Sequence, residues 1–362
     1  MRIWKNCFGM SRKNWSEIFI IALCISVVPS LVSGQTLSER MDKYLTDLNA
    51  KEKFNGSIIV TRGDDVLLSK GYGFADAEHK VANSPETRFR IGSMTKQFTS
   101  MAIMILQEQG KLKVTDTLGK HISGIPDEWK KLTVHQLLTH TSGIMHSWSL
   151  SGFVETMMVP ASLDEVLKRF YDKPLLFTPG EGFQYSGVGY FVLAKLIEVE
   201  SGKSYDEFLQ ENIFIPLGMS STGSDHPEVI LEKRARGYII VNGRLNNAPT
   251  LYIPILTGGG NLYSTVEDMA QWDRALRNKK LISQESYNAL YRPERNNYAY
   301  GWMVAEKEGL RVLNHSGGVP GFSSNILRIP EKKICVAVMT NVTPCDVGTI
   351  TNRLAKMVLE NK

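Results

Sequence analysis

Residues 90–98 read Arg90-Ile91-Gly92-Ser93-Met94-Thr95-Lys96-Gln97-Phe98, and the fold can be worked out from this stretch outward. Apolar residues then recur at the spacing of an amphipathic helix, at Phe98, Met101, Ala102, Ile105 and Leu106. The pattern stops at Gly110, a residue type that commonly ends a helix. The spacing therefore predicts Ser93 in the first turn of a helix whose other face is buried, with Lys96 one turn away on the same side.

Ser93 and Lys96 are the residue types of an activated nucleophile. A serine hydroxyl attacks a carbonyl poorly unless a base takes its proton, and a neighbouring lysine can do so when its pKa is depressed. The N-terminus of a helix also offers unpaired N–H groups where an oxyanion would form. The same spacing occurs where a serine caps a helix and an exposed lysine follows it. The choice between these interpretations depends on the rest of the chain.

Tyr185 is the second candidate residue. It follows the Gly/Pro-rich loop 177–184 and stands just before a predicted helix. A phenol near a lysine can ionise more easily than free tyrosine and then act as a general base or acid. A tyrosine that only packs at the start of a helix is the alternative.

The third segment is Asn314-His315-Ser316-Gly317-Gly318, between two predicted strands. Glycines there let another backbone approach closely, so we expect the Gly318 N–H to be the second oxyanion donor beside that of Ser93. Gly317 is expected in the same substrate-binding surface. His315 is expected to hydrogen-bond the leaving group or to orient Tyr185. A simple glycine-rich hairpin is the alternative.

The hydrophobic pattern changes character twice along the chain. A helix at 37–48 and a hairpin of strands at 56–61 and 66–72 precede the Ser93 helix. Further helices are predicted at Val134–Leu138, Leu163–Tyr171, Phe191–Ser201, Tyr205–Asn212 and Val266–Arg277. Strands then follow at Ala299–Val304, Arg311–Asn314, Ser323–Ile329 and Ile334–Thr340, before a last helix at 347–359.

This order predicts an α+β fold, in which an antiparallel sheet is flanked by terminal helices and carries an inserted, mainly helical lobe. The catalytic domain would occupy residues 35–362. Its α/β part would comprise 35–110 and 297–362, and its helical lobe 111–296.

The chain resembles the serine β-lactamase and penicillin-binding protein superfamily in three ordered motifs: Ser93-Met94-Thr95-Lys96, Tyr185-Ser186-Gly187 and His315-Ser316-Gly317. The likeness is greatest to the class C branch of β-lactamase-related serine hydrolases, which often has His-x-Gly as its third motif. It runs from about Leu37 to the C-terminus. Flanking segments that also match are 137–143, 177–180, 264–268 and 300–302.

The resemblance implies a β-lactamase/transpeptidase-like fold and an acyl-serine mechanism without a metal or a cofactor. By position, Ser93 is the nucleophile and Lys96 takes or relays its proton. Tyr185 is the general base for acylation and the acid toward the leaving group. His315 corresponds to the group that steadies Tyr185 and contacts the substrate.

One position departs from the family pattern. The middle motif usually ends in asparagine, whose side chain commonly touches both the motif lysine and the amide of a β-lactam side chain. Here the residue is Gly187, which we keep in the substrate-binding surface. Gly187 predicts that Lys96 lacks one hydrogen-bond partner, and that short esters are better substrates than cephalosporins. In the same family, His140 and Ser142 belong to a structural loop and are not assigned to the site.

The leading hypothesis is an exported serine hydrolase, esterase-like or D-peptidase-like, that cleaves an ester or amide bond. The alternatives are a β-lactamase or DD-carboxypeptidase, and a non-turnover penicillin-binding-like or ligand-binding module. The substrate would be a small-molecule ester, peptide or β-lactam-like compound. The oligomeric state is left open.

The N-terminus has the parts of an export signal. A basic region precedes the apolar run 18–32, and small residues follow it just before Gln35, so residues 1–34 are predicted to be a signal peptide. The run is shorter than the ~20 residues that span a membrane, and Pro29 interrupts it. A periplasmic or secreted protein without a stable membrane span after cleavage is predicted. An uncleaved membrane anchor is the alternative.

Charge and cysteine content exclude other classes. Three of the five formal positive charges come from residues 1–34, and no basic stripe with interleaved aromatic residues occurs, so nucleic-acid binding is not indicated. Two cysteines remain beyond the signal, Cys335 and Cys345. A disulfide between them is one interpretation, and a buried free thiol at Cys335 is the one we predict. No zinc-type spacing is present.

Overall fold

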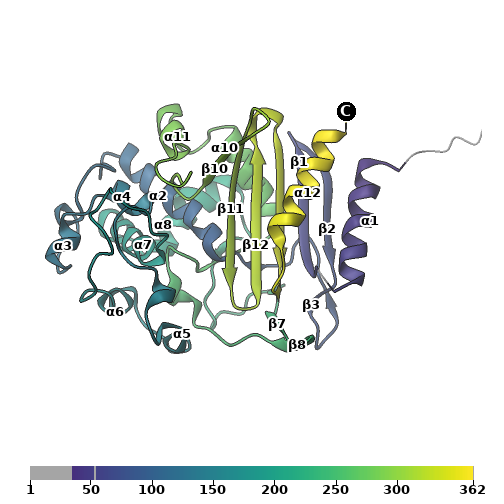
Figure 1. The fold of residues 1–362 in the computed structure, drawn as a ribbon, viewed down its shortest axis with the longest axis horizontal. Coiled ribbons are helices and arrows are strands. Elements are labelled where there is room, and N and C mark those ends of the chain that lie inside the picture. Colours follow the sequence, from purple (N-terminus) through teal and green to yellow (C-terminus); the bar gives the residue numbers. More distant parts are fainter. Residues whose placement is uncertain (1–34, 53, 362) are drawn as a thin grey trace, which may run out of the picture. The chain divides into compact units, whose positions relative to one another are not determined.

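Among the residues that the computed structural model describes, 35–52 and 54–361, a six-stranded antiparallel sheet carries the structure. Its strand order is β10-β11-β12-β13-β1-β2 (Figure 1). The strands are β1 (Gly56–Arg62), β2 (Asp65–Tyr72), β10 (Met303–Lys307), β11 (Leu310–Val319), β12 (Phe322–Ile329) and β13 (Ile334–Thr340). The N-terminal hairpin therefore joins the C-terminal strands through the pairing of β1 with β13.

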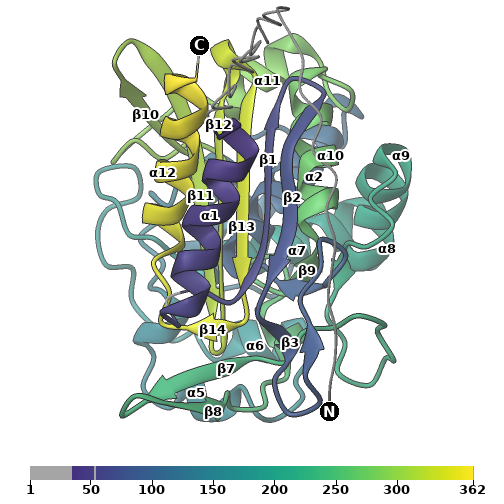
Figure 2. The same ribbon diagram turned by 90° about the vertical axis from the view of Figure 1, so that its right-hand side faces the viewer.

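Helices cover both faces of this sheet. The terminal helices α1 (Leu37–Ala50) and α12 (Val347–Glu360) lie on one face, and α10 (Val266–Arg277) packs on β1 and β13 from the other (Figure 2). Successive strand side chains point to opposite faces, so Ile58 joins the core beneath the terminal helices while Ile59 joins the core on the other side. Burial on both faces explains why β13 is apolar along nearly its whole length.

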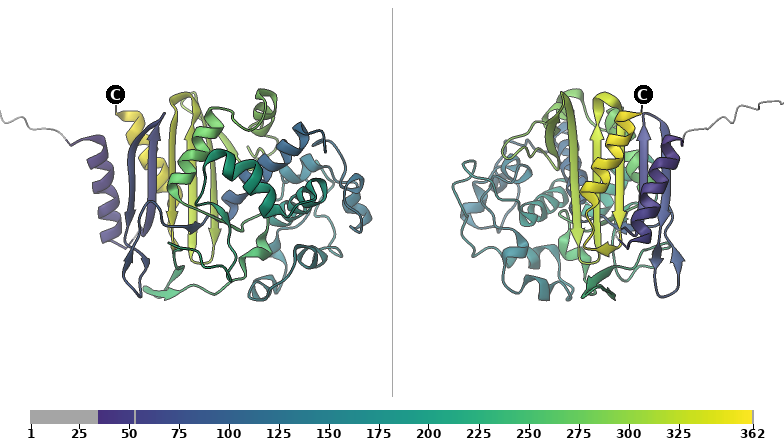
Figure 3. Two further views of the ribbon diagram at one scale, coloured as in Figure 1. Left: turned by 180° about the vertical axis from the view of Figure 1, so that it is seen from behind. Right: turned by 45° about the vertical axis from the view of Figure 1, so that its right-hand side comes forward.

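The middle of the chain forms the remaining helices and several small sheets. In Figure 3 its green and teal helices lie on the face of the sheet opposite the purple and yellow terminal helices. The helices are α2 (Thr95–Glu108), α3 (Asp127–Lys130), α4 (Val134–Leu138), α5 (Phe153–Thr156), α6 (Leu163–Lys168), α7 (Gly187–Ser201), α8 (Tyr205–Leu209), α9 (Ile215–Leu217) and α11 (Gln284–Leu290). The short strands are β3 (Phe74–Asp76), β4 (Val81–Ala82), β5 (Phe89–Arg90), β6 (Gly223–Ser224), β7 (Tyr238–Val241), β8 (Arg244–Asn247), β9 (Leu262–Ser264) and β14 (Val342–Thr343).

Three elements have the bounds that the sequence predicted. The helices at Val134–Leu138 and Val266–Arg277 and the strand at Ile334–Thr340 have the predicted bounds. The fold class is confirmed, since mixed helices surround an antiparallel sheet with helical termini on one face. Helix α10 lies in the range assigned to the helical lobe and yet packs on the sheet.

Five element predictions need correction. Helix α7 begins at Gly187, four residues before the predicted start, because Ser186 caps it by accepting a hydrogen bond from the Gly189 N–H. The helix predicted to reach Tyr171 ends at Lys168, and the one predicted to reach Asn212 changes to a π-helix after Leu209.

The other two corrections concern the C-terminal strands. The strand predicted at 299–304 begins only at Met303, because a left-handed glycine, Gly301, presses its backbone against the Lys96 carbonyl. The strand predicted to end at Asn314 continues through Val319, so the His315–Gly318 motif lies inside β11 and not in a hairpin loop.

The predicted signal peptide, residues 1–34, lies outside the described residues. In the described part of the chain, no helix combines the length and the apolar character that crossing a membrane requires. Cys335 is a buried free thiol in β13, as predicted.

Candidate active site

Ser93 lies at the junction of a small sheet and a buried helix. Strand β5 pairs with β9, and the Ile91 N–H donates to the Leu262 carbonyl, which holds the chain just before Ser93. Ser93 itself is in a 3₁₀ turn, Gly92–Met94, that leads into α2. The first turn predicted for Ser93 is therefore a 3₁₀ turn, and the α-helix itself begins at Thr95. Helix α2 is also buried on every side through Leu106, where a single buried face was expected.

Lys96 points at Ser93 from inside the protein. It is only 1% exposed, and its Nζ lies 3.1 Å from Ser93 Oγ. Burial of the amine lowers its pKa to about 7, so the neutral form is well populated near neutral pH. The amine also donates to the carbonyl oxygen of Gly259 at 2.7 Å. Gly259 thus supplies a partner where the sequence predicted one to be missing.

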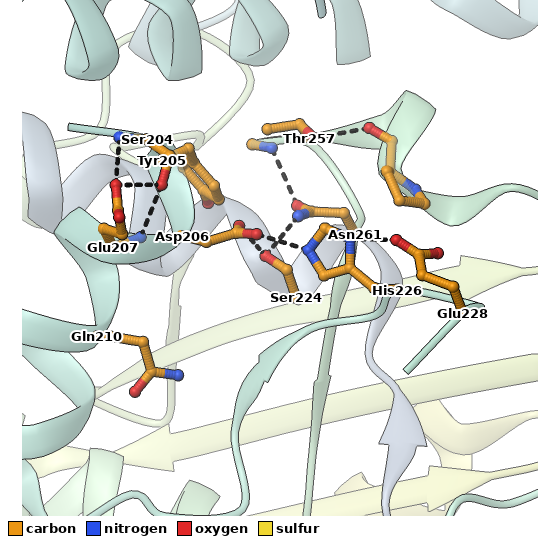
Figure 4. A network of polar contacts seen from close by, with 12 residues as sticks. Ser204, Tyr205, Asp206, Glu207, Gln210, Ser224, His226, Glu228, Thr257 and Asn261 are labelled. Atoms are coloured by element: carbon orange, nitrogen blue, oxygen red, sulfur yellow. Dashed lines mark hydrogen bonds and ion pairs between the residues drawn. The ribbon is translucent and has the colours of Figure 1, made fainter. Parts of the chain in front are cut away.

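The loop that presents the Gly259 carbonyl is held by a polar network. Asn261 Oδ1 accepts from the Gly258 N–H at 3.0 Å, and Asn261 Nδ2 donates to Ser224 Oγ at 2.8 Å. Ser224 in turn hydrogen-bonds Asp206 of α8, whose other carboxylate oxygen lies 2.6 Å from His226 Nε2 (Figure 4). The position of Lys96 therefore depends on contacts from α8 and β6, far from the motifs in sequence.

Tyr185 stands beside Lys96 at the start of α7. The Lys96 Nζ lies 4.8 Å from the centre of the Tyr185 ring. The ring borders the cleft, but desolvation of its hydroxyl raises the pKa above that of free tyrosine, and a hydrogen bond with Ser93 only partly offsets this. The environment thus favours the neutral phenol, contrary to the expected easier ionisation.

The backbone of β11 approaches the Ser93 turn very closely. A Cβ on Gly317 would lie 1.9 Å from the Ile91 carbonyl oxygen, and a Cβ on Gly92 would lie 2.6 Å from the Gly318 nitrogen. Gly92 also has a left-handed backbone, with φ of +49°. Glycine is required at both positions for this approach. Ser93 and Gly318 both line the same cleft.

The cleft has a volume of about 440 Å³. Residues from all three predicted segments line it, namely Ser93, Tyr185, His315, Ser316, Gly317 and Gly318. The lining also includes four residues that the sequence did not indicate: Phe183, Asn296, Tyr298 and Met303. A serine, a buried lysine with a lowered pKa and a pair of close backbone segments match the geometry of a serine acyl-transfer site.

Comparison with known proteins agrees with this geometry, because the family described as Beta-lactamase matches residues 41–357. The chain belongs to the Beta-lactamase family. It is a serine hydrolase of the β-lactamase and penicillin-binding protein type.

The similar proteins span most of the chain. A penicillin-binding protein of Bacillus subtilis (strain 168) is 27% identical over 334 residues, which cover 85% of this chain and 72% of that protein. The octameric penicillin-binding protein homologue from Pyrococcus abyssi is 31% identical, with a TM-score of 0.80, and the match covers 88% of this chain and 77% of the homologue's chain. The D-amino acid amidase from Ochrobactrum anthropi SV3 is 21% identical, with a TM-score of 0.78, and the match covers 90% of this chain and 99% of the amidase. At this identity the likeness shows a shared fold alone.

In this site of a Beta-lactamase family protein, His315 does not hydrogen-bond Tyr185, the residue that it was predicted to orient. Its Nδ1 donates to the Ser316 carbonyl at 2.6 Å, so its Nε2 is the acceptor for the Tyr298 hydroxyl at 2.9 Å. Burial and the Lys96 charge lower the His315 pKa to about 3, which keeps the ring neutral. The His315 ring centre is 6.3 Å from that of Tyr185, and its hydrogen bond goes to Tyr298 instead.

Three residues that sequence reasoning left out surround Tyr185. His140 packs against its ring at 4.3 Å between centres and accepts from the Ser186 N–H at 3.1 Å. His146 lies 5.5 Å from the same ring, and Tyr298 lies 6.0 Å from it. The left-handed backbone of His140, with φ of +60°, cannot be seen in the sequence. The only available signal was the closeness of these residues to matched segments.

One group in the described residues has the composition of a metal site. Ligand atoms of Asp76, Glu78 and His79 lie within 4.8 Å of one another at the end of β3 and in the turn that follows it. His79 Nδ1 already contacts Asp76 at 3.0 Å, and Glu78 pairs with Arg236. None of the three lines the cleft at Ser93.

Proposed function

We propose that the protein is an exported serine hydrolase that cleaves an ester or amide bond through an acyl-Ser93 intermediate. The observation that carries the proposal is the buried Lys96 amine, which lies 3.1 Å from Ser93 Oγ and has its pKa lowered to about 7. An amine with this pKa can accept a proton near neutral pH and still return it.

In acylation, neutral Lys96 takes the proton of Ser93 Oγ as the oxygen attacks the substrate carbonyl carbon. The carbonyl oxygen becomes an oxyanion that accepts hydrogen bonds from the N–H groups of Ser93 and Gly318. Such donors stabilise charge that develops only in the transition state, and removing one typically costs ~10²–10³ in rate.

Tyr185 completes the proton path. Because burial keeps its phenol neutral, it can pass a proton from the Lys96 ammonium to the leaving group as the carbonyl re-forms. Water then attacks the acyl carbonyl carbon and gives up a proton to neutral Lys96, and this proton returns to Ser93 Oγ as the bond between Oγ and the acyl group breaks. His315, through its hydrogen bond with Tyr298, fixes the part of the cleft lining beside Tyr185.

The substrate class rests on the family and on the open cleft. Relatives named penicillin-binding proteins and an amidase of D-amino acids support an ester, peptide or β-lactam-like substrate. The segment 1–34 supports export to the periplasm or medium.

Covalent labelling tests the proposal. Protein from Gln35 onward should be acylated by a fluorophosphonate or an activated ester on the peptide that contains Ser93, and Ser93→Ala should abolish the label. Lys96→Ala and Tyr185→Phe should slow acylation by ~10²-fold, the scale of lost acid–base catalysis. Labelling that persists in Ser93→Ala would overturn the proposal.

A further inference from the structure

The space beside Gly187 is occupied by another part of the chain. Gly187 begins α7 and is not among the glycines with a left-handed backbone. A Cβ built on it would meet Ser147 Oγ at 3.1 Å and His146 Cε1 at 3.5 Å. The volume into which the family's asparagine would extend is therefore bordered here by His146 and Ser147, from the segment between α4 and α5.

The hydrogen bonds of His146 define where its proton lies. The Trp148 N–H donates to His146 Nδ1 at 3.3 Å. A backbone N–H can only donate, so Nδ1 is an acceptor and the neutral ring carries its proton on Nε2. Burial, together with the Lys96 charge, lowers the His146 pKa to about 4, so the ring is neutral at physiological pH. Across residues 35–52 and 54–361, the structure shows no hydrogen-bond partner for Nε2.

His146 borders a small recess next to the nucleophile. The recess has a volume of about 20 Å³ and is lined in part by Ser93, Lys96, Gly187 and Gly318. This is room for about one water-sized group, such as a carbonyl oxygen. A neutral N–H donor at the edge of such a recess suits an uncharged acceptor.

We propose that His146 is a substrate-binding residue whose Nε2–H donates to the acylamino carbonyl oxygen of an N-acylated amino acid ester or amide. The inference rests on the proposed acyl-Ser93 function and specifies its substrate class. It also revises the expectation drawn from Gly187 alone, since His146 supplies a donor on the side where the asparagine amide is missing.

Two p-nitrophenyl esters separate this role from general catalysis. The N-acetyl-D-alanine ester carries the acylamino group, whereas the propionate ester has the same leaving group and lacks it. Wild-type protein should prefer the N-acetyl-D-alanine ester in kcat/KM. His146→Phe keeps a ring but removes the N–H, and should lower kcat/KM for that ester about tenfold, the scale of one lost hydrogen bond. The propionate ester should change less than about twofold.

Two further variants make the test specific. His146→Gln restores a donor and should recover part of the preference. His79→Phe replaces a histidine whose side chain is 73% exposed and should change neither ester. In the triple variant His146→Ala/Ser147→Ala/Gly187→Asn, the asparagine has room and should restore the preference for the N-acetyl-D-alanine ester.

The outcomes distinguish the two proposals. An equal loss on both esters in His146→Phe, or no loss on either, would overturn the role of His146 and leave the acyl-Ser93 mechanism intact. If wild-type protein hydrolyses neither ester and Ser93 is not labelled, the proposed function fails and this inference fails with it.

Discussion

The two walls of the cleft are built in different ways. On the sheet side, backbone meets backbone, since β11 lies so close to the Ser93 turn that a Cβ on Gly317 would be 1.9 Å from the Ile91 carbonyl oxygen. On the helical side, side chains meet, with the rings of His140 and His146 4.3 and 5.5 Å from that of Tyr185. The first wall has no room for a side chain at Gly317. On the second wall, single side chains can be replaced without moving the backbone. The departure from the family pattern, Gly187, lies on this wall.

The largest effect is expected on the backbone wall. Gly317→Ala should lower the rate of Ser93 acylation by ~10²-fold or more, because it pushes the oxyanion donors out of position. Overpacking of this kind should also destabilise the protein by ~1–3 kcal/mol. Labelling rates and thermal unfolding would measure both effects.

Gly318→Ala is the matched control for that prediction. A Cβ at 318 would meet only the Phe322 carbonyl oxygen, at 4.0 Å, and the variant keeps its N–H. Its unfolding temperature should stay close to that of the wild type. Equal destabilisation by both substitutions would show that the close approach of Gly317 to the Ile91 carbonyl is not the cause.

The pH dependence of the acylation rate tests the role of Lys96 as the base. Burial lowers the pKa of Lys96 to about 7, so the amine is protonated below this pH and cannot accept the Ser93 proton. The acylation rate should therefore rise with pH, by about tenfold from pH 6 to a plateau above pH 8. Single-turnover kinetics with an activated ester would measure the profile. A rate that is flat from pH 6 to 9, or that rises only near pH 10, would rule out Lys96 as the base.

The smallest effect is expected from the side-chain contacts at the edge of the cleft. Tyr298→Phe removes the donor to His315 Nε2 and leaves a buried acceptor unpaired, which should cost about 1–3 kcal/mol of stability. Tyr300→Phe removes a similar hydrogen bond, to His135 Nδ1 at 2.7 Å. The His135 side chain is 36% exposed, so water can replace the lost partner and the cost should be smaller. Chemical denaturation of both variants would show the difference, and a larger cost for Tyr300→Phe would contradict it.

Much of the fold could be predicted because its main elements carry strong local patterns. Helix α10 and strand β13 have the predicted bounds, since α10 has a strong helical period and β13 is a continuous apolar run. The errors lie where packing overrides the local pattern. The strand predicted at 299–304 starts late because Gly301 must fit against the Lys96 backbone. Strand β11 extends through Val319 because β12 pairs with it from Leu313 to Val319.

For the site, the sequence by itself determined the spacing of Ser93 and Lys96, the place of Tyr185 before a helix and the glycines of the third motif. These are properties of a few neighbouring residues, and the three motifs together identify the family. Only the tertiary structure decided that the Gly259 carbonyl, 163 residues away, binds Lys96, and that Tyr298 binds His315. It also placed His146 beside Gly187, and raised the pKa of Tyr185 through burial. Such contacts join segments distant in the chain, and desolvation depends on every group around a site, so neither is encoded in a local pattern.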